Sequence, residues 1–273
     1  MSFWENTRKP EGLGGKLMVS LMNLGHSPVA RWGLRFLNVA PDAKVLDCGC
    51  GGGANIKRLL KKCPRGIVKG IDYSPVSVEK SQKVNADAIA KGRCTILQGS
   101  VAKRIFAEGW FDAVTAFETV YFWPELPQCF HEIHRMLEPG GMFLICNESS
   151  GDTDKDEKWT KIIDGMIIYK DVELKANLEQ AGFRDVQIHK NKWGWLCVTA
   201  EMRSGNDMSI FASILRGVYR LSGAKKAFAL PEDALSKEIE KQNRHRGVFM
   251  PADRKAYYET MTVNGFPCLI VRE

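Results

Sequence analysis

A glycine-rich segment near residue 50 has the residue types and spacing to hold a ligand. The apolar run Val45–Cys48 contains Asp47, and glycines at positions 49, 51, 52 and 53 lead into a helix-like stretch. This pattern indicates a buried strand, a turn almost without side chains, and a helix N-terminus. Such a turn lets backbone N–H groups approach a ligand closely. It predicts a nucleotide-like cofactor in contact with Gly49, Cys50, Gly51 and Gly53.

Two acidic residues narrow the choice of cofactor. Asp72 ends a second strand-like run and lies 19 residues beyond Gly53, the spacing at which an acid reaches ribose hydroxyls in a βαβ unit. A carboxylate at Asp47 would repel the pyrophosphate of a dinucleotide and attract a positive charge. The glycines also satisfy the dinucleotide fingerprint, so a nicotinamide oxidoreductase is an alternative, although the sequence has no Tyr-x-x-x-Lys pair.

Four segments in the right order together resemble the class I S-adenosylmethionine-dependent methyltransferases of small-molecule type, over about residues 1–203. The first is the glycine loop that begins at Asp47, and the second is Gly70-Ile-Asp-Tyr-Ser74. The others are a strand and loop over residues 111–121, and a helix, Pro-Gly-Gly turn and strand over residues 131–145.

The resemblance implies roles for residues along the cofactor, S-adenosylmethionine. Asp47 and the glycine loop would hold its methionine end. Asp72 would accept hydrogen bonds from both ribose hydroxyls, and Tyr73 would pack on the adenine. Many relatives have Asp where this chain has Ser100, which puts direct recognition of the adenine amino group in doubt. Further cofactor contacts are expected from Ser100, Val101 and Phe117.

The acceptor side of the site is aromatic in this sequence. The loop Glu118–Pro124 lacks the Pro-Pro and Pro-Cys elements of enzymes that methylate nucleic-acid bases, and it carries Tyr121, Phe122 and Trp123 instead. Aromatic walls suit an apolar or cationic small molecule; packing in the core is the alternative. The expected substrate contacts are Tyr121, Trp123, Met166 and Tyr169.

Three residues are candidates for acid–base chemistry. His26 resembles an N-terminal element of the small-molecule branch that folds over the cofactor, and it would act as a base or merely pack. Glu118 would orient an acceptor amine or bond to the backbone, and Tyr121 is the third candidate. A base is needed only if the acceptor must lose a proton. No metal ligands are expected, and a non-catalytic module that binds S-adenosylmethionine is a third hypothesis.

The elements that position these residues alternate between strands and helices, which predicts an open, mostly parallel α/β sheet. The resemblance implies a Rossmann-like sheet of seven strands with helices on both faces, the last strand antiparallel. Ligands of such sheets bind at the carboxyl ends of the strands. Strands are expected near 44–48, 67–72, 94–98, 112–117, 142–147, 186–189 and 196–200, and helices near 27–38, 54–62, 76–91, 125–137 and 170–181.

Three regions are expected along the chain. Residues 1–43 form a helical lid that begins with a flexible glycine-rich lead-in at 12–16, and residues 44–203 form the cofactor domain. Residues 204–273 form an extension without chemistry of its own, which faintly resembles the N-terminal segment of bacterial α/β-hydrolase esterases. It contains an amphipathic stretch, which would allow oligomers, and a strand-like end at 267–271.

Composition is typical of a soluble cytoplasmic protein. The chain has 273 residues, of which 44% are hydrophobic and 26% charged. No apolar run has the length of a membrane span, and eight scattered cysteines without a Cys-x-x-Cys pair predict reduced thiols. The net charge of +7 comes from dispersed residues, so nucleic acid is not an expected partner.

Overall fold

The computed structural model describes residue 10, residues 12–103 and 105–202, and three strands later in the chain (226–229, 257–263 and 266–272). The chain divides into two compact units, Met1–Arg203 and Ser204–Glu273.

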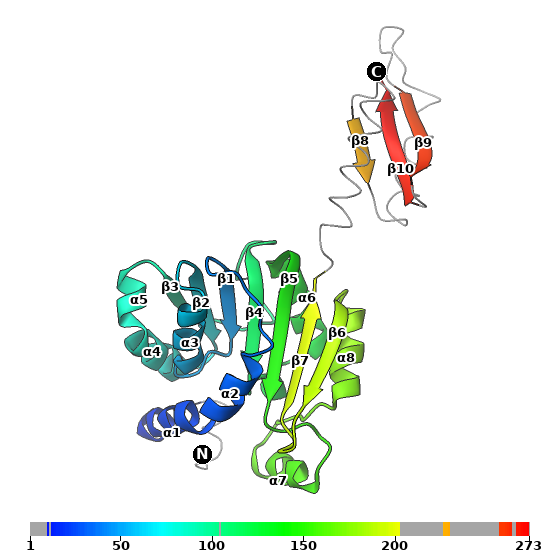
Figure 1. The fold of residues 1–273 in the computed structure, drawn as a ribbon. Helices are drawn as coiled ribbons and strands as arrows, with labels where there is room; N and C mark the ends of the chain where they lie inside the picture. Colours follow the sequence, from blue (N-terminus) through cyan, green and yellow to red (C-terminus); the bar gives the residue numbers. More distant parts are fainter. Residues whose placement is uncertain are drawn as a thin grey trace. The chain divides into compact units, whose positions relative to one another are not determined.

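A seven-stranded sheet forms the centre of the first unit (Figure 1). Its spatial order is β3-β2-β1-β4-β5-β7-β6, and only β7 runs antiparallel to its neighbours. This confirms the predicted fold class. The order reverses between β1 and β4, the place where ligands bind in open α/β sheets. The strands are β1 (Lys44–Cys48), β2 (Ile67–Asp72), β3 (Cys94–Gln98), β4 (Phe111–Phe117), β5 (Leu137–Asn147), β6 (Arg184–Lys190) and β7 (Leu196–Glu201).

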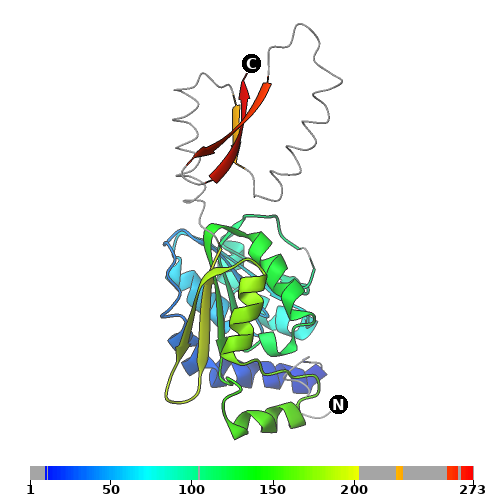
Figure 2. The same ribbon diagram turned by 90° about the vertical axis from the view of Figure 1, so that its right-hand side faces the viewer.

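Helices cover both faces of this sheet, because neighbouring strand residues point to opposite sides. Val45 packs with one buried cluster, which receives Ile56 and Leu59 from α3, and Leu46 packs with the other, which receives Phe130 from α6. Figure 2 shows α6 and α8 together on one side of the sheet. The helices of the parallel part are α3 (Ala54–Lys62), α4 (Pro75–Val84), α5 (Ala86–Ala90), α6 (Leu126–Met136) and α8 (Asp171–Gln180).

The N-terminal region is more helical than the sequence indicated. Helix α1 spans Gly12–Gly25 and α2 spans Ser27–Gly33, so the prediction of a flexible lead-in at 12–16 was wrong. Met18 and Val19 of α1 are buried, and burial outweighs the low helix propensity of glycine. Helix α2 ends at Gly33, before the expected residue 38, and the chain turns there, with Arg35 N bonded to Trp32 O.

Two further details depart from the expectations. An additional helix, α7 (Asp154–Ile162), follows β5, where Thr153 and Asp156 form a capping box at its start. Strand β5 also begins at Leu137 and so includes the Pro-Gly-Gly segment that was expected to be a turn. Figure 1 shows α1, α2 and α7 at the end of the sheet toward which β4 and β5 point.

The described part of the second unit is a three-stranded antiparallel sheet of order β8-β10-β9. Its strands are β8 (Lys226–Ala229), β9 (Tyr257–Val263) and β10 (Phe266–Arg272). Strand β10 confirms the strand expected at 267–271. The amphipathic stretch expected near residue 214 lies outside the described residues.

The structure also bears on the state of the cysteines and on the lengths of the helices. The seven cysteines whose side chains are described are free, as the spacing predicted. Within the described residues, every helix is too short or too polar to cross a membrane.

A chain that ends at Arg203 is expected to fold by itself and to bind the expected cofactor about as well as the full chain. Both main buried clusters and all seven strands of the large sheet lie before this residue. Thermal melts, light scattering and cofactor titration of the two chains check this. A shortened chain that is insoluble or does not bind would show that residues 204–273 are needed.

Candidate functional site

A cavity of about 880 Å³ opens at the carboxyl ends of the parallel strands. The glycine loop and the ends of β2 and β3 form one end of it, through residues such as Gly51, Asp72 and Ser100. The segments after β4 and β5, together with α7, form the other end, and α1 also borders the cavity. The first is called the cofactor end below and the second the acceptor end.

The backbone amides of the glycine loop bond within the protein. The N–H groups of Gly49 and Cys50 donate to Ile71 O at 2.8 and 3.0 Å, and Gly53 N donates to Cys50 O. Gly51 N donates to Asp72 Oδ2 at 2.9 Å. The sequence suggested that these amides approach a ligand as donors. In the structure the loop forms a wall of the cavity that is almost without side chains, and its amides are hydrogen-bonded to the end of β2.

Three of the four loop glycines, Gly49, Gly51 and Gly53, serve different purposes. Gly49 has φ +71°, and a Cβ there would overlap Thr119. Gly51 has φ +51° and open space where its Cβ would lie, in the wall of the cavity. Gly53 is outside the cavity lining and lets the start of α3 pack on Ser81 of α4. Of the three, only Gly51 faces the empty space directly with no neighbour in the way.

Asp72 lies at the cavity edge with both carboxylate oxygens positioned by backbone groups. Oδ1 accepts from Ser74 N at 2.9 Å, and Oδ2 accepts from Gly51 N. Burial raises the pKa of this carboxyl, and these hydrogen bonds oppose the shift. Each carboxylate oxygen has a second lone pair, so Asp72 can still accept bonds from a ligand.

The other residues predicted to contact the cofactor lie in the cavity wall. Tyr73 is 39% exposed and presents a surface for a flat ring. Phe117 ends β4 beneath the cavity, and Ser100 bonds back to its own loop, accepting from Ala102 N at 3.3 Å. The predicted residues in this part of the lining are Cys50, Tyr73, Ser100, Val101 and Phe117.

Asp47 lies beneath the loop, outside the cavity lining, so a direct ligand contact is not what the structure shows. Its carboxyl is 1% exposed. Oδ1 accepts from Thr115 Oγ1 at 2.8 Å, whereas Oδ2 has no hydrogen-bond partner. Burial raises the pKa of Asp47 to about 7, and the negative charge of Asp72 adds to the shift. A positive charge in the cavity above would favour the ionised form.

Replacing Asp47 with asparagine is therefore expected to stabilise the ligand-free protein by clearly more at about pH 8.5 than at about pH 5. The pKa of this carboxyl is near its ordinary value of 3.8 in the unfolded chain and about 7 in the folded one. Stability consequently falls as pH rises between these values, by up to roughly 4 kcal/mol. Thermal melts of both proteins across pH check this. An equal effect of the substitution at both pH values would show that ionisation of Asp47 does not reduce the stability of the folded protein.

The acceptor end is lined by aromatic and sulfur-containing side chains. Tyr121, Trp123 and Met166 lie in its wall as predicted, and Tyr169 does not. Tyr169 packs against one of the two core clusters and borders a separate, smaller hollow. The remaining aromatic residues of the wall are Phe122, Trp159, Trp193 and Trp195.

The Tyr121 hydroxyl is held by the backbone and is not available as a base. It accepts from Ser149 N at 3.0 Å and donates to Ser149 O at 3.3 Å. Burial, and then the nearby Glu118 carboxyl, raise the pKa of this tyrosine well above its ordinary value. The expectation of a catalytic Tyr121 therefore gives way to a role in fixing the segment after β5.

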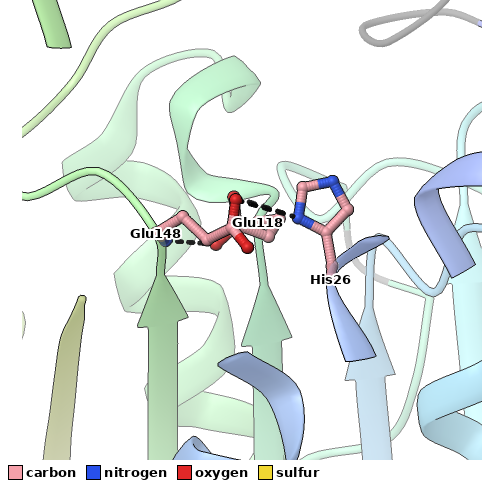
Figure 3. A group of neighbouring side chains, drawn as sticks. All are labelled: His26, Glu118 and Glu148. Atoms are coloured by element: carbon pink, nitrogen blue, oxygen red, sulfur yellow. Dashed lines mark hydrogen bonds and ion pairs between the residues drawn. The ribbon is translucent and has the colours of Figure 1, made fainter. Parts of the chain in front are cut away.

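Three titratable side chains meet at the acceptor end: His26, Glu118 and Glu148 (Figure 3). His26 Nδ1 lies 3.6 Å from Glu118 Oε2 and 3.7 Å from Glu148 Oε2. Glu118 accepts a hydrogen bond from Glu148 N. Burial raises the pKa of both glutamates and lowers that of His26.

Glu148 is the member of this group that the sequence analysis missed. It follows β5 directly, just as Glu118 follows β4. Because the carboxyl ends of adjacent parallel strands meet at one edge of a sheet, paired acids after β4 and β5 were the available signal. The bond that Glu118 accepts from the backbone is one of the two roles that the sequence left open for it.

Comparison with known proteins shows which family and which solved structures this domain is similar to. Residues 46–145 match the family model described as a methyltransferase domain. A solved geranyl diphosphate C-methyltransferase from Streptomyces coelicolor A3(2), in complex with Mg²⁺, geranyl diphosphate and S-adenosyl-L-homocysteine, shares the fold with a TM-score of 0.58 and 15% identity. The match covers 71% of this chain and 86% of that one. Residues 46–145 therefore belong to a methyltransferase domain.

Curated relatives of this methyltransferase domain include two plant enzymes. Cycloartenol-C-24-methyltransferase of Arabidopsis thaliana is 30% identical over 159 residues, which are 54% of this chain and 46% of that protein. Cycloartenol-C-24-methyltransferase 1 of Oryza sativa subsp. japonica is 32% identical over 109 residues, 40% and 31% of the two chains. The matched region thus spans less than half the length of these relatives.

Proposed function

We propose that this methyltransferase domain binds S-adenosylmethionine at the cofactor end and transfers its methyl group to a small molecule at the acceptor end. The observation that carries the proposal is the pairing of Gly51 and Asp72 in the cavity wall. Gly51 leaves open space beside the loop, and the Asp72 carboxylate is fixed at its edge. Together they fit the ribose and methionine parts of this cofactor.

The charges at the cofactor end support the same ligand. S-adenosylmethionine supplies a methyl group on a sulfonium, and it carries an ammonium group as well. Asp72 in the wall and Asp47 beneath the loop are carboxyls that burial leaves without full solvation. Cationic groups nearby would compensate for that burial. A dinucleotide would bring two negative charges to the same place, which argues against the nicotinamide alternative.

The residues of the acceptor end would orient the acceptor rather than activate it by redox or covalent chemistry. Tyr121 fixes the segment after β5, and the aromatic wall excludes water from an apolar molecule. Alignment of the reacting atoms is worth several kcal/mol, up to about ten. His26, Glu118 and Glu148 are the groups at the acceptor end to which we assign uptake of a proton, where the acceptor must lose one.

The acceptor we propose is apolar and unsaturated. The aromatic and methionine lining of the acceptor end suits such a molecule, and the named relatives methylate carbon atoms of sterols or geranyl diphosphate. A nucleic-acid acceptor is not proposed, since the basic residues are dispersed. We place the activity in the cytoplasm, which the free thiols support.

Incubation of the full chain with methyl-labelled S-adenosylmethionine tests the proposal, using sterols and linear isoprenoids as one set of acceptors and amines and phenols as another. We expect acceptor-dependent formation of S-adenosylhomocysteine with the first set. Turnover only with the second set would correct the acceptor class. Cofactor binding without turnover on either set would favour a non-catalytic module.

A further inference from the structure

We propose that His26, Glu118 and Glu148 form a binding site for a divalent transition-metal ion at the acceptor end of the cavity. One ligand atom from each residue lies within 4.8 Å of the other two. The three side chains come from separate parts of the fold: the α1–α2 junction, the end of β4 and the end of β5 (Figure 3). The proposal does not depend on methyl transfer, because metal binding can be measured by itself.

The spacing of the three residues fits ligands better than hydrogen-bond partners. His26 Nδ1 lies 3.6 and 3.7 Å from its two carboxylate neighbours, beyond the usual N–H···O range. Ligands held at about 2.1 Å from a tetrahedral metal are roughly 3.4 Å apart. Nδ1 is thus within a few tenths of an ångström of ligand spacing from each carboxylate, and the two carboxylates lie within 4.8 Å of each other.

The backbone holds Glu118 toward this point. Glu118 has φ +56°, a conformation that costs energy for a residue with a side chain. Its Oε1 accepts from Glu148 N, which ties the ends of β4 and β5 together and leaves Oε2 facing His26. Strain of this kind gathers at functional sites. The ligand atoms are therefore positioned before any ion arrives.

The two carboxyl groups of this site favour the binding of a cation. Two carboxyls share this site, and each is more costly to ionise because of burial. Within the described part of the chain, the only ion-pair partner of either glutamate is His26. His26 Nδ1 is itself buried and without a hydrogen-bond partner. A divalent ion would satisfy all three groups at once.

The donor set indicates the kind of metal. One imidazole nitrogen and two carboxylates suit Zn²⁺, Mn²⁺, Co²⁺ or Fe²⁺ more than Ca²⁺ or Mg²⁺, which prefer oxygen ligands alone. Three protein ligands also leave coordination positions open, as in catalytic metal sites. Since all three residues line the cavity, an open position would face it and could hold an oxygen atom of the acceptor.

Titration of chelator-treated full-length protein with Co²⁺ alone tests the site, with visible absorption and calorimetry as readouts. We expect one saturable ion with the d–d spectrum of nitrogen and oxygen ligands. His26→Ala, Glu118→Gln and Glu148→Gln should each weaken binding at least tenfold. The matched controls are His131→Ala and Glu179→Gln, which alter exposed residues on α6 and α8 and should bind as the parent does.

Three outcomes would overturn the proposal. They are no binding to the parent protein, binding unchanged in the three variants, and a sulfur-to-cobalt charge-transfer band that places the ion at cysteines. If Glu118→Gln fails to fold because the bond to Glu148 N is altered, the other two variants decide, since the side chains that they change take no part in that bond. Melting curves of each variant identify such a failure.

Discussion

Replacing Gly51 with valine is expected to abolish binding of S-adenosylhomocysteine while the protein stays folded. The Cβ of a residue at this position would meet nothing within 4 Å, so the valine side chain would extend into the cavity where the cofactor is proposed to lie. The left-handed backbone, with φ +51°, costs about 1–3 kcal/mol for a residue with a side chain. Calorimetry and thermal melts of parent and variant check both parts.

Gly92→Val is the matched control for this substitution. Gly92 also has positive φ and open space where a Cβ would lie, but it belongs to the exposed turn before β3. The control should lose similar stability and keep full affinity. Normal binding by folded Gly51→Val protein would mean that the cofactor does not lie against the loop.

Replacing Asp72 with alanine is expected to weaken S-adenosylhomocysteine binding roughly hundredfold, since two hydrogen bonds to a charged acceptor are worth about 3 kcal/mol. The variant also loses the native bonds from Ser74 N and Gly51 N, so a lower melting temperature should accompany the loss. Calorimetry at a temperature well below the melting transition separates the two effects.

Asp112→Ala controls for the structural part of this change. The Asp112 carboxylate accepts a backbone hydrogen bond from Lys44 N at 2.7 Å and lies outside the cavity lining. We expect it to reduce stability with little change in affinity. An Asp72→Ala protein that binds as tightly as the parent would remove Asp72 from the cofactor site.

The fold was predictable because its signals are local. Runs such as Val45–Cys48 and Ile67–Asp72 are apolar, short and bounded by glycines, and both are strands in the structure. Helix α1 was missed because its stability comes from the burial of Met18 and Val19, which no local pattern of a glycine-rich segment reveals.

The sequence could predict those residues of the site whose positions follow from the ends of the strands. Asp72 and Phe117 lie in the cavity wall because each ends a parallel strand. The bonds from the loop amides to Ile71 O depend on the close approach of the loop to the end of β2. The exclusion of Tyr169 from the cavity depends on the path of the chain after β5. The distances within the group formed by His26 and its carboxylates are likewise set only in three dimensions.

The most direct test of the central claim is calorimetric titration of the full chain with S-adenosylhomocysteine and, separately, with NAD. The cavity at the β1–β4 reversal, with its Gly51 wall and fixed Asp72 carboxylate, predicts saturable binding of S-adenosylhomocysteine at one site and no binding of NAD. Binding of NAD, or no binding of S-adenosylhomocysteine by the folded protein, would contradict it.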